Sequence, residues 1–448
     1  MLDQMFTPEN FRRVFDSENR KGFDVGGRFF PHLQPHTTSI RNKTKEIRDL
    51  RSQETTIGAD EFSSKVTALK KELKELKSKK SAEINSSLEQ VSSNVLKSNF
   101  TLSLEQRIGP KGKPIYHTDG SPESFFVVKQ LQYNIRKIYK VKQSNRNDLV
   151  CQLRDCLQSR FPFCVVRTDV SSFYESIDRS RLIAKIDEDN LLTYSTKKYI
   201  RQILNEYGRL SGSPTGIPRG VGISAYLAEL YFRPIDSKIQ SLSRLVLYCR
   251  FVDDIVAVFA RPHFGKQIGS YADLIATKLS EFGLKSNPEK TVEFTVGGPK
   301  RQKIEYLGYR FVLKDGECRI WPSAAKIRKY KARIKAAFAQ YNVQSSLRSR
   351  RAFRDLVARV KFLTGNARLW NSRSTALTGV YYNNPIVTEK SSFALLDRRL
   401  KSFVKSVPRP TLRKRLKKYT FTTGFEERRF HNFSPKELQT IVRAWKHE

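Results

Sequence analysis

The stretch YCRFVDDIVAVF, residues 248–259, places two adjacent aspartates, Asp253 and Asp254, inside an otherwise apolar run. A carboxylate buried among apolar side chains is costly unless it is paired, hydrogen-bonded or bound to a metal. Two neighbouring carboxylates also repel each other, so their removal is expected to raise the melting temperature in the absence of metal. The flanking residues are β-rich, which predicts a hairpin with the aspartates at its tip, where bound cations can neutralise them.

A further aspartate lies upstream in a similar setting. Asp169 ends the β-rich run of VVRTDVSSFYESID, 84 residues before Asp253. Two strands lying side by side would bring Asp169 and Asp253 together as ligands for divalent cations. Because these ligands are oxygens, with no His or Cys nearby, Mg²⁺ is favoured and Mn²⁺ is the alternative. Two such ions about 4 Å apart are the usual apparatus of nucleotidyl transfer.

The charge balance favours a nucleic-acid partner. The 83 Lys and Arg residues exceed the 44 Asp and Glu residues, which gives a net charge of +39. Such a surplus points to nucleic acid or, less often, to an anionic membrane. No run of about 18 apolar residues occurs, so a membrane helix is not expected. The five cysteines are odd in number and form no CxxC pair, and the opening residues lack a secretory signal, which is typical of a cytoplasmic protein with reduced thiols.

The pattern along the 448 residues predicts several segments. Residues 1–40 are expected to form a compact irregular opening, and residues 41–97 an exposed amphipathic helix that could close into a helical hairpin. The Gly- and Pro-rich residues 107–124 predict a long loop. From about residue 322 the chain is helical and basic. In residues 326–341 one apolar stripe is expected to face inward, formed by Ile327, Tyr330, Ile334, Ala337, Phe338 and Tyr341.

Five segments between about residues 165 and 312 resemble, in order, the motifs of reverse transcriptases. RTDVSSFYESID resembles the first palm motif, GIPRGVGISAYLAELY the motif that follows it, and RFVDD the signature with two aspartates. FGLKSNPEKT and IEYLGYRF resemble the two motifs that close the palm. The resemblance implies an α+β right-hand polymerase fold, with fingers, an antiparallel-sheet palm and a helical thumb. It also implies RNA-directed DNA polymerase activity, with an RNA template, deoxynucleotides as substrates and a DNA product.

The resemblance assigns roles in the palm residue by residue. Asp169 and Asp253 match the metal-binding aspartates of the family, and Asp254 matches the second aspartate of the pair. The backbone carbonyl of Val170 would be a further metal ligand. Tyr174 stands where the family places a bulky side chain beneath the sugar of the incoming nucleotide, so it would select deoxynucleotides. The alternative, a plain core aromatic, fits the neighbouring Phe173 better.

Other matches concern the nucleotide and the nucleic acid. Gly220 would let the backbone approach the template–nucleotide pair, and Lys290 matches a lysine that approaches the triphosphate. In the fingers, Lys142 and Arg146 are candidate triphosphate clamps, although these charges could equally bind template. Leu307 and Gly308 match the hairpin that grips the primer end. On the basic helix, a thumb that tracks the duplex would use Lys329, Arg333 and Lys335.

Two positions depart from common reverse transcriptases, which have glutamine where Arg219 stands and proline where Ala225 stands. Arg219 thus puts a cation next to the nascent base pair, as a nucleotide-binding candidate of uncertain role. PRGVGIS, LAELY, FLTGNARLW and GVYYNNP resemble the bacterial defence-associated reverse transcriptases of the abortive-infection and unknown-group class, its type 3 systems among them. That resemblance implies antiphage defence with a dedicated non-coding RNA. A second copy of the chain or a second polymerase subunit is a candidate partner.

The ranges expected from these motifs are 1–104 for an N-terminal extension, 105–164 for fingers, 165–315 for the palm with part of the fingers inserted, and 316–448 for the thumb and a C-terminal extension. Two other functions stay open at this point. One is a template-independent or protein-templated DNA polymerase on the same palm. The other is a catalytically silent RNA-binding scaffold, which the intact aspartates disfavour because a scaffold gains nothing from clustered carboxylates.

Overall fold

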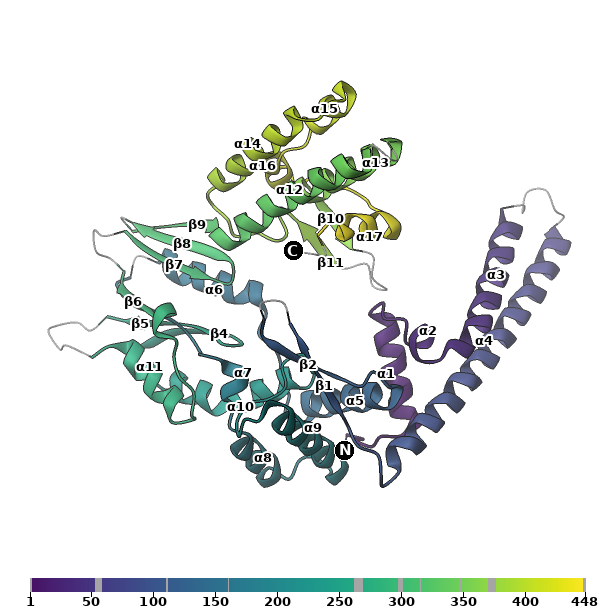
Figure 1. The fold of residues 1–448 in the computed structure, drawn as a ribbon, viewed down its shortest axis with the longest axis horizontal. Coiled ribbons are helices and arrows are strands. Elements are labelled where there is room, and N and C mark those ends of the chain that lie inside the picture. The colour runs from purple at the N-terminus through teal and green to yellow at the C-terminus, as the bar shows by residue number, and fades with distance from the viewer. Residues whose placement is uncertain are drawn as a thin grey trace. The chain divides into compact units, whose positions relative to one another are not determined.

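The computed structural model describes residues 2–52, 59–109, 112–159, 161–261, 269–296, 301–314, 316–345, 349–369 and 376–445. The chain forms two compact units (Figure 1). Unit 1 comprises residues 1–142, 172–235 and 282–284, and unit 2 comprises residues 143–171, 236–281 and 285–448. Within the described ranges, every helix is too short or too polar to span a bilayer. The four ranges expected from the motifs remain predictions, since this two-way division is a different one.

Unit 1 is mostly helical. Its elements are α1 (Pro8–Arg20), α2 (Val25–Phe29), η1 (Pro31–Leu33), α3 (Gln34–Arg51), α4 (Ala59–Leu96), β1 (Leu104–Ile108), β2 (Pro114–Thr118), α5 (Pro122–Ile138), α7 (Phe173–Ser176), α8 (Arg179–Glu188), α9 (Tyr194–Ser211) and most of α10 (Ser224–Gln240). Its core is rich in aromatic residues, with Phe11 against Phe126 and Phe6 against Tyr199.

Two expectations for unit 1 are corrected. The opening residues are helical rather than irregular, because the Thr7 side chain caps α1 by accepting a hydrogen bond from the Asn10 amide and Pro8 fits the first turn. The expected loop at 107–124 includes the end of β1, all of β2 and the start of α5, and the antiparallel β1–β2 hairpin pairs Leu104 with Thr118. By contrast, the helical hairpin predicted for residues 41–97 is confirmed, since α3 and α4 lie side by side (Figure 1).

Unit 2 holds the sheets and the basic helices. Its elements are α6 (Arg146–Gln158), β3 (Phe163–Asp169), β4 (Leu245–Phe251), β5 (Asp254–Ala260), α11 (Tyr271–Ser280), η2 (Pro288–Lys290), β6 (Val292–Thr295), β7 (Gln302–Tyr306), β8 (Tyr309–Lys314), β9 (Glu317–Pro322), α12 (Ala324–Ser345), α13 (Ser349–Thr364), β10 (Asn366–Leu369), β11 (Ala376–Gly379), α14 (Ser391–Lys405), α15 (Pro410–Leu416), α16 (Phe421–Glu426) and α17 (Pro435–Arg443). One antiparallel sheet has the strand order β4-β5-β3-β6, and a second has the order β7-β8-β9.

A continuous apolar core joins these parts of unit 2. It runs from Val165 and Val256 in the first sheet, through Phe311 in the second, to Ile334 of α12 and Phe393 of α14. The stripe predicted for residues 326–341 is confirmed, since all six of its side chains are buried in this core. All five cysteines are free thiols, as their spacing predicts.

Candidate active site

The strand arrangement predicted for the aspartates is confirmed. In the antiparallel pairing of β3 with β5, Asp169 lies directly opposite Asp254. Val252 and Asp253 form the connection between β4 and β5, so Asp253 stands at the tip of that hairpin. The Val170 amide donates to the Asp253 carbonyl at 3.0 Å, which joins the end of β3 to the tip. Strand register therefore gathers the three carboxylates and the Val170 backbone at one edge of the sheet.

The hairpin tip has a strained backbone that a buried ion pair supports. Val252 has φ +60°, a left-handed conformation that is unusual for a β-branched residue. Arg250 donates to the Val252 carbonyl at 3.0 Å and also holds Asp236 through two bonds of 2.8 and 2.7 Å. Because Arg250 is buried and Asp236 neutralises it, the guanidinium is a rigid support for the tip.

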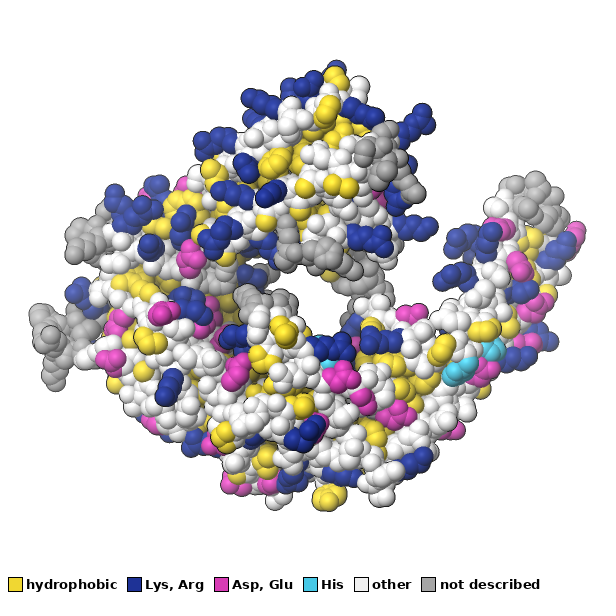
Figure 2. All heavy atoms as spheres, viewed as in Figure 1, with side chains coloured by type: hydrophobic (Ala, Val, Ile, Leu, Met, Phe, Trp, Pro, Cys, Tyr) yellow, Lys and Arg dark blue, Asp and Glu magenta, His cyan; other side chains and the backbone are white. Residues whose placement is uncertain are grey.

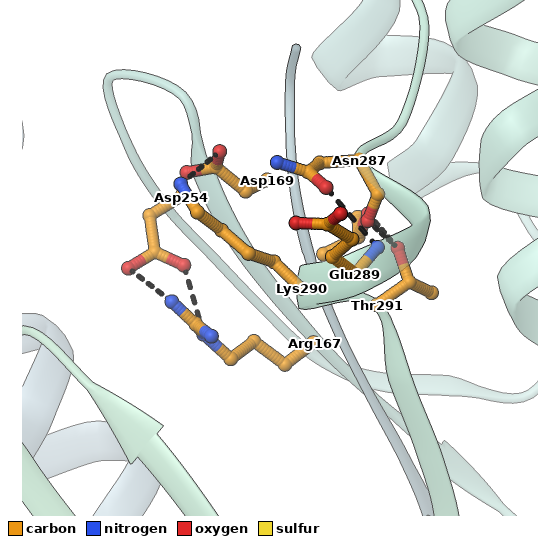
Figure 3. A network of polar contacts seen from close by, with 8 residues as sticks. Arg167, Asp169, Asp254, Asn287, Glu289, Lys290 and Thr291 are labelled. Carbon is orange, nitrogen blue, oxygen red and sulfur yellow. Dashed lines mark hydrogen bonds and ion pairs between the residues drawn. The ribbon is translucent and has the colours of Figure 1, made fainter.

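Each of two carboxylates has a cationic partner (Figure 3). Lys290, at the end of η2, places its ammonium 2.7 Å from Asp169 Oδ2. The Arg167 guanidinium donates to both carboxylate oxygens of Asp254, at 3.1 and 3.3 Å. Asp254 is thus paired from the neighbouring strand, and the rise in melting temperature expected on removal of the aspartate pair stays a prediction. Lys290 lies at the site, but on a carboxylate in this structure, and its contact with a triphosphate stays a prediction.

The electrostatics of the site favour a further cation. The pKa of Asp254 is raised to about 6, mainly by burial; the charge and hydrogen bond of Arg167 lower it, and the charges of Asp169 and Asp253 raise it. Among the residues that the structure describes, no group of three or more His, Cys, Asp or Glu side chains could hold a metal ion alone. Mg²⁺ does not need such a cage, since one or two carboxylates with water and substrate phosphates commonly hold it. Asp169, Asp253 and the Val170 carbonyl fit that all-oxygen ligand set.

Tyr174, Arg219 and Gly220 lie in unit 1, where the segment after Tyr174 is tied to the segment before Arg219. Backbone bonds run from the Ile217 amide to the Tyr174 carbonyl at 2.8 Å and from the Gly216 amide to the Ile177 carbonyl at 2.7 Å. Phe173 is the buried core aromatic, whereas Tyr174 is only half-buried. Tyr174 is thus less buried than its neighbour, and its place beneath the sugar of the nucleotide stays a prediction.

Arg219 has a partner that the sequence comparison did not suggest. Its guanidinium bonds the Glu175 carboxylate at 3.0 Å and lies 5.3 Å from the centre of the Tyr174 ring. The extra cation is therefore paired within the protein. At Gly220, φ is +105° and a Cβ would stand 2.7 Å from the Tyr116 carbonyl oxygen. The close approach that requires glycine in this structure is to the β2 backbone.

The two candidate triphosphate clamps belong to different compact units. Lys142 is exposed in unit 1, whereas Arg146 begins α6 in unit 2. The Arg146 side chain donates to the carbonyl of Leu307, in the turn between β7 and β8. Leu307 and Gly308 both have positive φ, at +45° and +77°. Arg146 therefore lies on the turn predicted to grip the primer, and the triphosphate clamp with Lys142 stays a prediction.

Lys326 adds a second cation at this turn. Its ammonium lies 4.4 Å from the centre of the Tyr309 ring and donates to the Asn383 carbonyl. Burial lowers the pKa of Lys326 to about 7, and the Arg146 charge contributes in the same direction. The turn is thus flanked by two cations on different helices, Arg146 of α6 and Lys326 of α12.

The cations of α12 form two rows rather than one face. The helical repeat puts Lys326, Lys329 and Arg333 in one row, with spacing i, i+3 and i+7, and Arg328, Lys331 and Lys335 in another. Lys335 therefore lies in a different row from Lys329 and Arg333, and the binding of a duplex by these three residues stays a prediction. Arg333 also packs over Trp445, with its guanidinium 5.2 Å from the ring.

Sequence reasoning missed Arg167. The signal was present, because an arginine in the apolar strand FCVVRTDV needs a carboxylate partner. Residues two apart on a strand share a face, so Arg167 lies beside Asp169 and diagonal to Asp254. Knowing the register of β3 against β5 would have identified the pair.

Residues 124–311 match the family described as reverse transcriptase (RNA-dependent DNA polymerase). No curated protein matches the chain. The match agrees with the α+β right-hand polymerase fold predicted from the sequence, which is thereby confirmed.

Several solved structures are similar to the chain. Two are apo telomerases from Candida tropicalis, one of them truncated from its C-terminal domain, each with 14% identity. The truncated one has a TM-score of 0.35, with 61% of this chain and 73% of that chain covered. The other has a TM-score of 0.42, with 78% and 63% covered. A telomerase from Candida albicans with an RNA fragment has 12% identity and a TM-score of 0.34, with 77% and 62% covered. The chain thus spans less than two thirds of the last two.

Proposed function

We propose that this chain, whose residues 124–311 form a reverse transcriptase domain, synthesises DNA on an RNA template with two divalent metal ions at Asp169, Asp253 and the Val170 carbonyl. The enzyme class, RNA-directed DNA polymerase, follows from the domain. The observation that carries the metal assignment is the register that sets Asp169 opposite Asp254, beside the tip residue Asp253. Mg²⁺ is the proposed ion, since the ligands are all oxygens.

Each residue has a distinct task in this proposal. Bound divalent ions would supply the acidity that favours an ionised 3′-hydroxyl and the charge that stabilises pyrophosphate. Asp169 and Asp253 orient those ions from the two strand ends. Arg167 keeps the Asp254 carboxylate ionised. The carboxylate and the guanidinium therefore remain an ion pair. The Lys290 ammonium, which pairs with the Asp169 carboxylate in this structure, lies at the site where a nucleotide would bind. When a nucleotide arrives, this ammonium exchanges the carboxylate for a phosphate oxygen.

A template-dependence assay tests the proposal. The purified protein is given an RNA template with a paired DNA primer, Mg²⁺ and deoxynucleotides, and the product is sequenced. We expect DNA complementary to the template, and none after ribonuclease treatment of the template. DNA unrelated to any added template would instead establish a template-independent or protein-templated polymerase. No DNA under any condition, with RNA binding intact, would establish a silent scaffold.

We also propose that the natural template is a dedicated non-coding RNA and that the chain acts in bacterial antiphage defence. The support is the resemblance of PRGVGIS, with Arg219, to defence-associated relatives. Sequencing the nucleic acid that copurifies with the protein tests the first part. A single enriched RNA species with a matching DNA product is expected, whereas random host RNA would contradict it.

Sugar selection gives a first prediction. Replacing Tyr174 with Ala is expected to let ribonucleotides compete better, by on the order of 100-fold in the ratio of the two kcat/KM values, because the ring that rejects a 2′-hydroxyl is gone. Phe173→Leu is the matched control, since Phe173 is buried and points to the core. An unchanged ratio in Tyr174→Ala would show that this ring does not select the sugar.

The two rows of α12 give a second prediction. The row that starts beside the primer-grip turn is expected to follow the duplex, so Lys329→Gln with Arg333→Gln should weaken binding to an RNA–DNA hybrid. The log–log salt dependence should become shallower by roughly 0.7 to 0.9 per lost phosphate contact. The control pair, Arg328→Gln with Lys335→Gln, removes the same charge from the other row. Equal losses in both pairs would contradict the assignment of the duplex to one row.

A further inference from the structure

The C-terminal part of unit 2 carries a dense basic surface away from the palm sheet. Between residues 398 and 418 there is no acidic residue. We call this the α14–α15 basic surface, and its cations are Arg398, Arg399, Lys401, Lys405, Arg409, Arg413, Lys414, Arg415, Lys417 and Lys418. Figure 2 shows Lys and Arg side chains gathered over α14 and α15, at the top of the view.

Four of these cations converge on one hollow. An open hollow of about 470 Å³ is lined by Lys405, Pro410, Arg413, Lys414 and Lys417. Lys405 ends α14, whereas Arg413 and Lys414 lie on the last turn of α15. The dipole of a helix favours cations at the C-terminus of that same helix. That effect does not explain why two helices direct their terminal cations into the same space, where the charges repel each other.

These cations have no acidic partners. Over the described part of the chain, none of the ten lies within ion-pair distance of a carboxylate, and all but Arg413 are exposed. Some exposed cations elsewhere do have a carboxylate partner, as in Lys65 with Glu61 and Lys390 with Glu426. An unpaired cluster of like charge raises the local potential and attracts polyanions. The surface is therefore built for an anionic ligand that the protein itself does not supply.

We propose that the α14–α15 basic surface binds the phosphate backbone of a double-helical nucleic acid outside the active site. For an enzyme that copies RNA, this ligand is a folded part of the RNA, and that identification rests on the proposed function. Single strands are usually held by exposed aromatic rings between the cations. Of the described residues in 398–418, none is an exposed aromatic, and Phe403 lies half-buried under Arg399. Duplex RNA needs only phosphate and sugar contacts.

A membrane surface fits less well. A helix that lies in a membrane interface needs a free apolar face beside its basic one. Six apolar side chains of α14 and α15 are buried in the core of unit 2, and of the large ones on α14 only Leu395 is exposed, at 38%; the six are Phe393, Leu396, Leu400, Val404, Leu412 and Leu416. Figure 1 draws α15 at the end of this unit away from β4 and β5, so the bound RNA would be separate from the primer terminus.

The test compares two fourfold variants of the full-length protein with equal net charge. The first combines Lys405→Gln, Arg413→Gln, Lys414→Gln and Lys417→Gln. The control combines Lys70→Gln, Lys71→Gln, Lys74→Gln and Lys77→Gln, which are exposed on α4. Affinity for an RNA hairpin without a primer end is measured by fluorescence anisotropy over a salt series. At physiological salt we expect the first variant to lose on the order of 100-fold and the control less than about threefold.

Further readouts make each outcome decisive. A charge-preserving variant, with Arg at positions 405, 414 and 417, should bind as the unchanged protein does. Circular dichroism checks that each variant is folded. Equal losses in both fourfold variants, or no loss in the first, would overturn the proposal. So would loss of binding to phosphatidylserine vesicles with hairpin binding intact, which would make the surface a membrane contact. Template-directed incorporation is assayed separately, so failure of the proposed function is distinguishable.

Discussion

Replacing Asp253 with Asn is expected to lower nucleotide incorporation on the order of a thousandfold and to leave the melting temperature almost unchanged. Divalent ions at such a site supply several kcal/mol of stabilisation to the reacting oxygens, and each 1.4 kcal/mol is tenfold in rate. Asp253 stands at the hairpin tip, where its backbone carbonyl accepts a hydrogen bond from the Val170 amide. Asparagine keeps the size of the side chain and removes its charge, so the tip should still fold.

The control and a second readout isolate the metal site. Asp273→Asn changes an exposed aspartate on α11 and should leave incorporation unchanged. Mn²⁺ affinity, measured by titration calorimetry without nucleotide, should fall in Asp253→Asn and Asp169→Asn alike. If Asp253→Asn incorporates nucleotides at the original rate, the active site proposed at these strand ends is wrong. If incorporation falls while Mn²⁺ affinity holds, Asp253 has a role other than metal binding.

Local pattern was enough to predict much of the palm. The hairpin with Asp253 at its tip and the pairing of its strand with that of Asp169 both follow from apolar runs that end in carboxylates. The buried stripe of α12 follows from the 3.6-residue repeat in the same way. Each of these features depends on residues close in sequence, or on one pairing that the chemistry of the aspartates requires.

Local pattern was not enough where register or side-chain direction decides the outcome. Lys329 and Lys335 are both off the apolar stripe of α12, yet they lie in different rows of the helix. The bond of Arg146 to Leu307 joins residues 161 apart, which the sequence around Arg146 does not indicate. The β1–β2 hairpin was taken for a loop because Gly and Pro are frequent there, and the pairing of Leu104 with Thr118 outweighs that composition.

Arg167 is the clearest case, and it carries the second large prediction. Replacing Arg167 with Gln is expected to lower the melting temperature by roughly 4 to 8 °C in metal-free buffer, at about 2 kcal/mol. The change leaves the Asp254 carboxylate, only 17% exposed, without its guanidinium and next to two other carboxylates. Breaking a fully buried pair costs about 3–5 kcal/mol, and partial exposure of this pair reduces that figure.

Two comparisons show whether the pair itself is responsible. Arg201→Gln breaks a more exposed Arg–Asp pair, with Asp187, and should cost less than about 1 kcal/mol. Combining Arg167→Gln with Asp254→Asn should recover part of the loss, because the unpaired charge is then gone. Saturating Mg²⁺ should also narrow the difference in melting temperature between Arg167→Gln and the unchanged protein, since ion binding stabilises the folded state and neutralises the same carboxylates.

A loss of stability in Arg167→Gln no larger than in Arg201→Gln would mean that Arg167 does not stabilise this edge of the sheet. With Asp253→Asn reducing activity and Arg167→Gln reducing stability, the two adjacent aspartates would have separate tasks: Asp253 for the metal and Asp254 for the fold.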